Sequence, residues 1–123
     1  MQIINTIMST WGGVVISFPE VRGRRDTTFI YKHNQATRGI ICAYKIDEKW
    51  SLHPDIRIER DSFKDLIVLE DIFTVPIIIA AEYNDRQVFA KVSNFYQDRK
   101  KYCHEEFAYL PKEKFELLFK DKK

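Results

Sequence analysis

The stretch "PIIIAAEY" (76–83) most constrains the fold of this chain, because its apolar residues run without a break. A strand buried on both faces needs such a continuous run, whereas a strand with one wet face alternates apolar and polar residues. The helical pattern "SFKDLIVLEDIFT" (62–74) precedes this run, and the alternating strand "QVFAKV" (87–92) follows it. A helix that leads into a central strand predicts an α/β fold, in which helices cover a sheet.

The N-terminal half predicts one helix followed by three strands. The apolar residues of the helix fall at helical spacing: Ile3, Ile4, Ile7, Met8 and Trp11. Gly12 and Gly13 are expected to end this helix. Strands are expected at 14–18, 27–32 and 39–45, the last two forming a hairpin across the polar stretch "HNQATR".

The remaining segments complete one domain that spans residues 1–123. A short strand is expected at 56–58, a charged loop at "DRKK" (98–101), a strand at 103–109 and a short helix after Pro111. The predicted architecture is therefore a mixed central sheet flanked by helices.

The composition describes a folded chain with no strong preference for a charged partner. Of its 123 residues, 45% are hydrophobic and 31% charged, and the net charge is only +2. Nucleic-acid binding would therefore have to come from local clusters of cations. The cysteines, Cys42 and Cys103, do not form a C-x-x-C pair, which favours a reducing compartment. With no apolar run near membrane-spanning length and no signal-peptide pattern, we expect a cytoplasmic protein without a membrane partner.

The mouth of the predicted hairpin carries chemically informative residues. Asp26 precedes the first strand, and Lys45 ends the second. Metal-dependent phosphodiester hydrolysis uses carboxylates to hold a divalent ion, and a cation or base to position the attacking water. One large nuclease fold supplies these groups from an Asp at the head of one strand and an acid-x-Lys triplet on the next, since alternation places the acid and the lysine on one face. Here the acid position is Ala43, and a methyl group cannot coordinate a metal.

From Trp11 onward the chain resembles the archaeal-type Holliday junction resolvase family, whose members cleave four-way DNA junctions. Three stretches carry the resemblance: "GGVVISFPEVRGRRDTTFIY", "IICAYK" and "DSFKDLIVLEDIFTVPIIIAAEYNDRQVFAKV". They are similar to the family's strand, basic loop and Asp-led strand, to its second hairpin strand, and to its helix, proline-led strand and following strand. The resemblance covers about residues 3–97 and implies the restriction-endonuclease-like (PD-(D/E)XK) fold.

Two of the four active-site groups that the resemblance implies are missing. Ala43 takes the place of one acid, and "IINTIMSTW" (3–11) has no acid where the family's first helix carries a Glu. Asp26 and Lys45 are either remnants of the site or, respectively, a turn residue and a strand-end lysine reaching solvent. The resemblance thus implies an inactive relative, and we expect no catalytic residue, no metal and no cofactor.

Basic residues around the hairpin are the predicted contacts to nucleic acid. They are Arg22, Arg24, Arg25, Lys32, Arg38 and Lys45. The first three fall in the loop that lies beside DNA in the resolvases, and the forked donors of Arg suit phosphate groups. The expected partner is duplex or branched DNA, including four-way junctions. The same cluster is also consistent with a solvated face that binds nothing.

Two other readings remain open at this stage. An active nuclease would need a displaced carboxylate from Glu20, Asp47 or Glu48, with Mg²⁺ or Mn²⁺ as its cofactor. A purely structural subunit would act only through an interface. The helix at 62–74 has more apolar surface than one sheet face covers, so Phe63, Ile67 and Phe73 are predicted to contact a second copy, an active resolvase or a repair protein.

Overall fold

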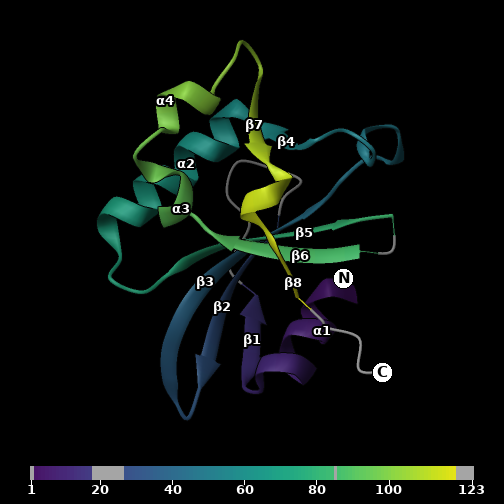
Figure 1. The fold of residues 1–123 in the computed structure, drawn as a ribbon. Coiled ribbons are helices and arrows are strands. Elements are labelled where there is room, and N and C mark those ends of the chain that lie inside the picture. The colour runs from purple at the N-terminus through teal and green to yellow at the C-terminus, as the bar shows by residue number, and fades with distance from the viewer. Residues whose placement is uncertain (1, 18–26, 85, 119–123) are drawn as a thin grey trace.

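The computed structural model describes residues 2–17, 27–84 and 86–118 (Figure 1). Its helices are α1 (Gln2–Trp11), α2 (Arg60–Ile72), α3 (Ser93–Tyr96) and α4 (Arg99–Tyr102), with 3-10 turns η1 (Glu48–Trp50) and η2 (Lys112–Lys114). Its strands are β1 (Val14–Ser17), β2 (Thr27–His33), β3 (Ala36–Lys45), β4 (Asp55–Glu59), β5 (Ile77–Tyr83), β6 (Arg86–Lys91), β7 (Phe107–Pro111) and β8 (Glu116–Leu117).

The main sheet has six strands in the order β1-β2-β3-β5-β6-β8. β3 and β5 pair in parallel, from Ile40 beside Ile77 to Lys45 beside Glu82, while the other neighbours pair antiparallel. A parallel pair needs a crossover connection, and here α2 provides it. β4 and β7 form a separate two-stranded antiparallel sheet. The expectation of an α/β fold with a mixed sheet and helices is confirmed.

Helices lie on both faces of the main sheet. Figure 1 shows α1 on one side and α2, α3 and α4 with the small sheet on the other. The strands therefore contribute alternate residues to two cores. Ile41 and Ala43 pack with α1, whereas Ile40 and Cys42 pack on the side of α2. Such alternation follows from the two-residue period of a strand.

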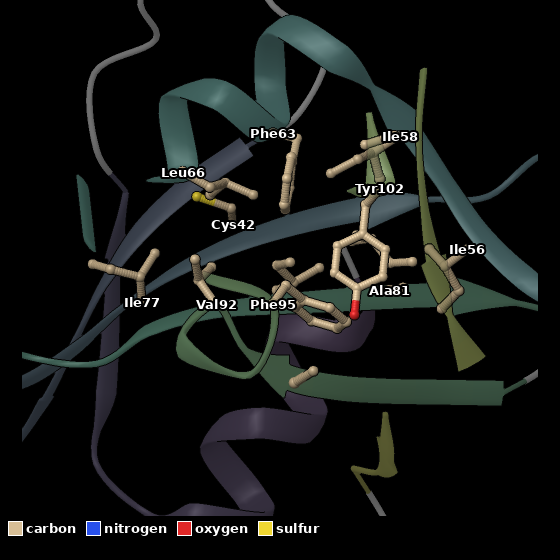
Figure 2. Close-up of a cluster of buried hydrophobic side chains, with 14 of the residues drawn as sticks. Cys42, Ile56, Ile58, Phe63, Leu66, Ile77, Ala81, Val92, Phe95 and Tyr102 are labelled. Carbon is tan, nitrogen blue, oxygen red and sulfur yellow. The ribbon is translucent and has the colours of Figure 1, made fainter. Parts of the chain in front are cut away.

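β5 is the central strand that its sequence predicts. Residues 77–81 are buried throughout, with Ile77, Ile79, Ala80 and Ala81 fully inaccessible. On the α2 side, Figure 2 shows Phe63 and Leu66 projecting from α2 toward Cys42 of β3. This core extends to Phe95 and Tyr102, whose rings lie edge to face with centroids 5.7 Å apart.

The N-terminal helix also follows its sequence pattern. Ile3, Ile4 and Ile7 are buried against the sheet, and the chain leaves the helix with positive φ angles at Gly12 (76°) and Gly13 (83°). The Tyr31 hydroxyl donates to the carbonyl of Gly12 at 2.8 Å. This bond ties the end of α1 to the hairpin.

Several element boundaries differ from the expectations. The hairpin turn is only Asn34–Gln35, whose φ angles of 54° and 64° allow a two-residue turn, so the strands take up the rest of "HNQATR". The expected charged loop at 98–101 contains most of α4. The last long strand lies at 107–111 because it pairs with β4, and a 3-10 turn stands where a helix was expected after Pro111.

The three predicted interface residues do not share one environment. Phe63 is fully buried in the core of its own chain, so the prediction that it contacts a partner is wrong for this fold. Ile67 is half-buried against the same core. Phe73 is exposed over 42% of its surface, and its neighbours Val68 (51%) and Ile72 (63%) are exposed as well.

Replacing Gly13 with Ala is expected to destabilise the chain by about 2 kcal/mol or more, because an L-residue is strained at positive φ. A Cβ there would also lie 2.4 Å from the Lys32 carbonyl oxygen, a backbone atom that cannot move aside easily. Urea unfolding followed by circular dichroism measures the loss. Gly39→Ala is the control, since its Cβ would meet only a 3.2 Å contact at an ordinary φ. An equal loss in both variants would contradict the role of Gly13 in the turn.

Phe63→Ala should cost about 3–5 kcal/mol of folding free energy, because it empties a fully buried site. Phe73→Ala should cost less than about 1 kcal/mol, since its ring is partly solvated. Parallel denaturant titrations of the two variants check this contrast. Similar losses from both would mean that the end of α2 is buried in solution, for example by a second copy.

Candidate functional site

Ala43 lies in the middle of the sheet and has no access to solvent. It pairs with Thr27 on one side and Ala80 on the other, and its methyl belongs to the apolar cluster under α1. Ile3 and Ile7 of α1 are in the same cluster and are also fully buried. A metal ion would need oxygen ligands and room for water at this position. The structure fills it with aliphatic carbon.

Lys45 stands two residues further along β3 and is exposed. Strand alternation places it on the same side as Ala43, but the strand ends here, and Ile46 already leaves toward the next loop. No carboxylate in the described ranges lies within ion-pair distance of its ammonium group. Lys45 therefore presents a solvated cation at the end of the parallel strand pair.

Asp26 and the loop arginines Arg22, Arg24 and Arg25 lie outside the described residues, and so does Glu20. The described chain resumes at Thr27, which pairs with Ala43. Thr28 follows, and its hydroxyl lies 3.8 Å from the Cys42 sulfur. The proposed partnership of Asp26 with Lys45 stays a prediction.

Lys32 and Arg38 lie at the other end of the hairpin from Lys45. Arg38 and Lys45 are seven residue steps apart along the extended strand, a span of about 23 Å at roughly 3.3 Å per step. Arg38 is the extra residue of a β-bulge between the pairs Tyr31–Gly39 and Lys32–Thr37, and its Nε donates to the His33 carbonyl at 3.4 Å. The described members of the predicted DNA-contacting set thus form two separate groups.

A pocket of about 220 Å³ opens where β3 ends. Its lining comes from the end of β3, the η1 loop, β4, the first turn of α2 and the start of β7. The residues are Tyr44, Lys45, Ile46, Asp47, Trp50, Arg57, Ile58, Glu59, Ser62 and Phe107. Two cations, two carboxylates and two hydroxyl groups therefore meet in one hollow. Of this set, only Lys45 and Asp47 carry a functional prediction from the sequence.

Arg57 is the most constrained charged side chain of this pocket. Its guanidinium carbon lies 3.8 Å from the centre of the Trp50 ring and 3.9 Å from that of Phe107. Contact of this kind between a guanidinium and aromatic rings is attractive and restricts the side chain. The alternation of Ile56, Arg57 and Ile58 in the sequence indicates that Arg57 points away from the core. It does not indicate that the side chain contacts two aromatic rings.

The η1 loop that carries Trp50 is capped by its own Asp47 and anchored to the rest of the fold by Lys112. The Asp47 side chain accepts from the Lys49 amide at 3.4 Å, and the Lys112 ammonium donates to the Ser51 carbonyl at 2.5 Å. Lys112 also lies over the Tyr83 ring, 4.4 Å from its centre. Burial lowers the pKa of Lys112, and the nearby Arg86 adds to the effect. Lys112 therefore positions a wall of the pocket without touching its interior.

The start of α2 is fastened to β3 inside the pocket. The Tyr44 hydroxyl and the Ser62 hydroxyl lie 2.7 Å apart, and Ser62 is buried. Glu59 occupies the N-cap position of the 13-residue helix, but its side chain makes no capping hydrogen bond. The amide groups of the first turn of a helix have no intrahelical acceptor, so this end carries a partial positive charge.

The described ranges contain no group of three or more His, Cys, Asp or Glu side chains arranged to hold a metal ion. Within them, no helix is both long enough and apolar enough to cross a membrane. Comparison of the chain with protein-family models, with curated proteins and with solved structures found no match.

Proposed function

We propose that this chain is a cytoplasmic domain of the restriction-endonuclease-like fold, of the resolvase type, that binds branched or duplex DNA without cutting it. It would act as a homodimer, or beside an active resolvase or repair protein. The order of elements supports this proposal. Apart from the short strand β4 before α2, the chain begins with the order of elements that the resemblance to resolvases implies: one helix, three strands, a helix and two further strands.

The burial of Ala43 is the observation that carries the inactive reading. In an acid-x-Lys site this position would supply a carboxylate to a divalent ion. Here the side chain is a methyl with zero exposure, packed with isoleucines of α1. Restoring an acid would bury a charge in an apolar cluster, which costs several kcal/mol unless the charge is paired. The surrounding core thus favours an apolar residue.

The basic side chains support contact with the DNA backbone rather than with the bases. Lys45 and Arg38 are exposed, and Lys32 is half-buried. Flexible cations at separate points of a surface neutralise phosphates and carry little sequence information. The two groups lie about 23 Å apart, estimated from the rise per strand residue, so they would contact different phosphates of an extended or branched partner.

Binding to a four-way junction should weaken by about a thousandfold between roughly 50 and 200 mM salt if all six basic residues contact phosphates. Lys45→Gln should weaken binding several-fold and make the salt dependence less steep by about one phosphate contact. Fluorescence anisotropy with a labelled junction measures both effects. Lys101→Gln, at an exposed position on α4, is the matched control and should leave binding unchanged.

Two outcomes would contradict the proposal. If the junction does not bind even at low salt, the chain is better explained as an interaction subunit. The exposed Val68, Ile72 and Phe73 on and after α2 favour that second candidate. Light scattering of the wild type and of Ile72→Ser then tests whether this surface holds two copies together. If Lys101→Gln weakens junction binding as much as Lys45→Gln does, the DNA contact is not localised to the predicted basic residues.

The active-nuclease alternative has one observation in its favour, because Asp47 lines the same pocket as Lys45. The inactive reading predicts no cleavage of a labelled junction above the protein-free rate in either Mg²⁺ or Mn²⁺, since Ala43 removes a ligand from the expected site. The assay includes Asp26→Asn, Asp47→Asn and an EDTA control. Metal-dependent cleavage by the wild type that either substitution abolishes would establish the enzyme and overturn the inactive reading.

A further inference from the structure

The guanidinium of Arg57 is held in place but does not use its hydrogen-bond donors. It packs against the rings of Trp50 and Phe107, yet it makes no hydrogen bond or ion pair with any residue in the described ranges. A guanidinium presents five N–H donors in a planar fork that matches the oxygens of phosphate or carboxylate. The two ring contacts do not supply acceptor atoms, so these donors can still bind an oxygen ligand. Arg57 is therefore a preorganised donor that lacks an acceptor.

A second donor of the same pocket also has no acceptor. Trp50 lines the hollow, and its indole Nε1–H is buried without a hydrogen-bond partner among the described residues. A buried donor that loses water without gaining an acceptor costs about 1–3 kcal/mol. Lys45, at the end of β3, lines the same pocket and adds a second positive charge to it.

The first turn of α2 adds a favourable field at the same place. Glu59 and Ser62, at the start of this helix, both line the pocket. Helix N-termini attract anions through their amide groups and their dipole. Asp47 and Glu59 oppose an anion, but the Asp47 carboxylate is turned toward the Lys49 amide. The donors of Arg57 and the start of the helix thus favour an anion rich in oxygen atoms over a cation.

We propose that this pocket binds a phosphate group, with the Arg57 fork as its principal contact and Lys45 as a supporting cation. The volume of about 220 Å³ suits a phosphate with part of its substituent rather than a whole large ligand. The ligand is either a free phosphate compound or the terminal phosphate of a nucleic acid. The proposal does not depend on junction binding, because its main residue, Arg57, is not among the predicted DNA contacts.

The two tryptophans of the chain provide a direct test by NMR. Trp50 borders the pocket, whereas Trp11 packs against Tyr31 and Phe89 on the other side of the sheet. Titration of the full chain with inorganic phosphate, at constant ionic strength, should shift the indole N–H resonance of Trp50 to saturation and leave that of Trp11 in place. Shifts that are absent, or that affect both resonances without saturating, would overturn the proposal.

Substitutions then identify the contact. Arg57→Met should weaken phosphate binding about tenfold or more, because it removes charge-assisted hydrogen bonds. Arg99→Met is the matched control, since Arg99 also stacks on a ring, 4.3 Å from the centre of Tyr96, but lies outside the pocket. Glu59→Gln should strengthen binding several-fold by removing a like charge. The Glu59→Gln variant tests the site even if Arg57→Met fails to fold. An unchanged affinity for phosphate in Glu59→Gln would count against the site.

A final comparison distinguishes the source of the phosphate. A short oligonucleotide is titrated with a 5′-phosphate and with a 5′-hydroxyl. Tighter binding of the phosphorylated strand than of inorganic phosphate would identify a nucleic-acid end as the ligand. Equal affinity for the two phosphates would identify the phosphate group alone. If the 5′-hydroxyl strand shifts Trp50 as strongly as the phosphorylated strand, the pocket does not recognise a terminal phosphate and the proposal fails.

Discussion

The parallel pairing of β3 with β5 is the constraint on which the rest of the structure depends. Two parallel neighbours cannot be joined by a hairpin, so the chain must leave the end of β3, cross one face of the sheet and return to the start of β5. α2 makes this crossing and buries Phe63 and Leu66 against the strands. The opposite face is closed by α1. Because both strands are covered on both sides, residues such as Ala43 and Ala80 are completely buried.

The same pairing determines where polar chemistry is possible. Within the sheet, alternate positions of β3 enter one core or the other, so neither face has room for a solvated group. Beyond Tyr44 the strand reaches solvent again, and there Lys45, the η1 loop and the first turn of α2 meet around a hollow. Pockets at the carboxyl ends of parallel strands are common in open α/β sheets for this reason. The position of the pocket therefore follows from the crossover.

The sequence predicts the elements whose signals are local. The continuous run at 77–81 identifies the central strand, the spacing of Ile3, Ile4 and Ile7 identifies the buried face of α1, and Gly12–Gly13 marks its end. The pocket escapes such reasoning because it is assembled from distant segments. Arg57 reaches Phe107 only because β4 pairs with β7, fifty residues later in the chain. The interface prediction at Phe63 fails for a related reason, since an apolar pattern does not say which element covers it.

Under the two proposals, Ala43 and Arg57 together explain how a domain of the proposed nuclease-like fold would bind phosphate without hydrolysing it. Hydrolysis needs carboxylates that hold a metal next to the scissile bond, whereas binding needs only donors and positive charge. The buried methyl of Ala43 supplies no metal ligand, and replacing it with a carboxylate would place a charge in the apolar core. Arg57, in contact with two rings outside that core, would meet the second. Since the two residues lie on different elements and in different environments, the proposed phosphate binding does not require a hydrolytic site at Ala43.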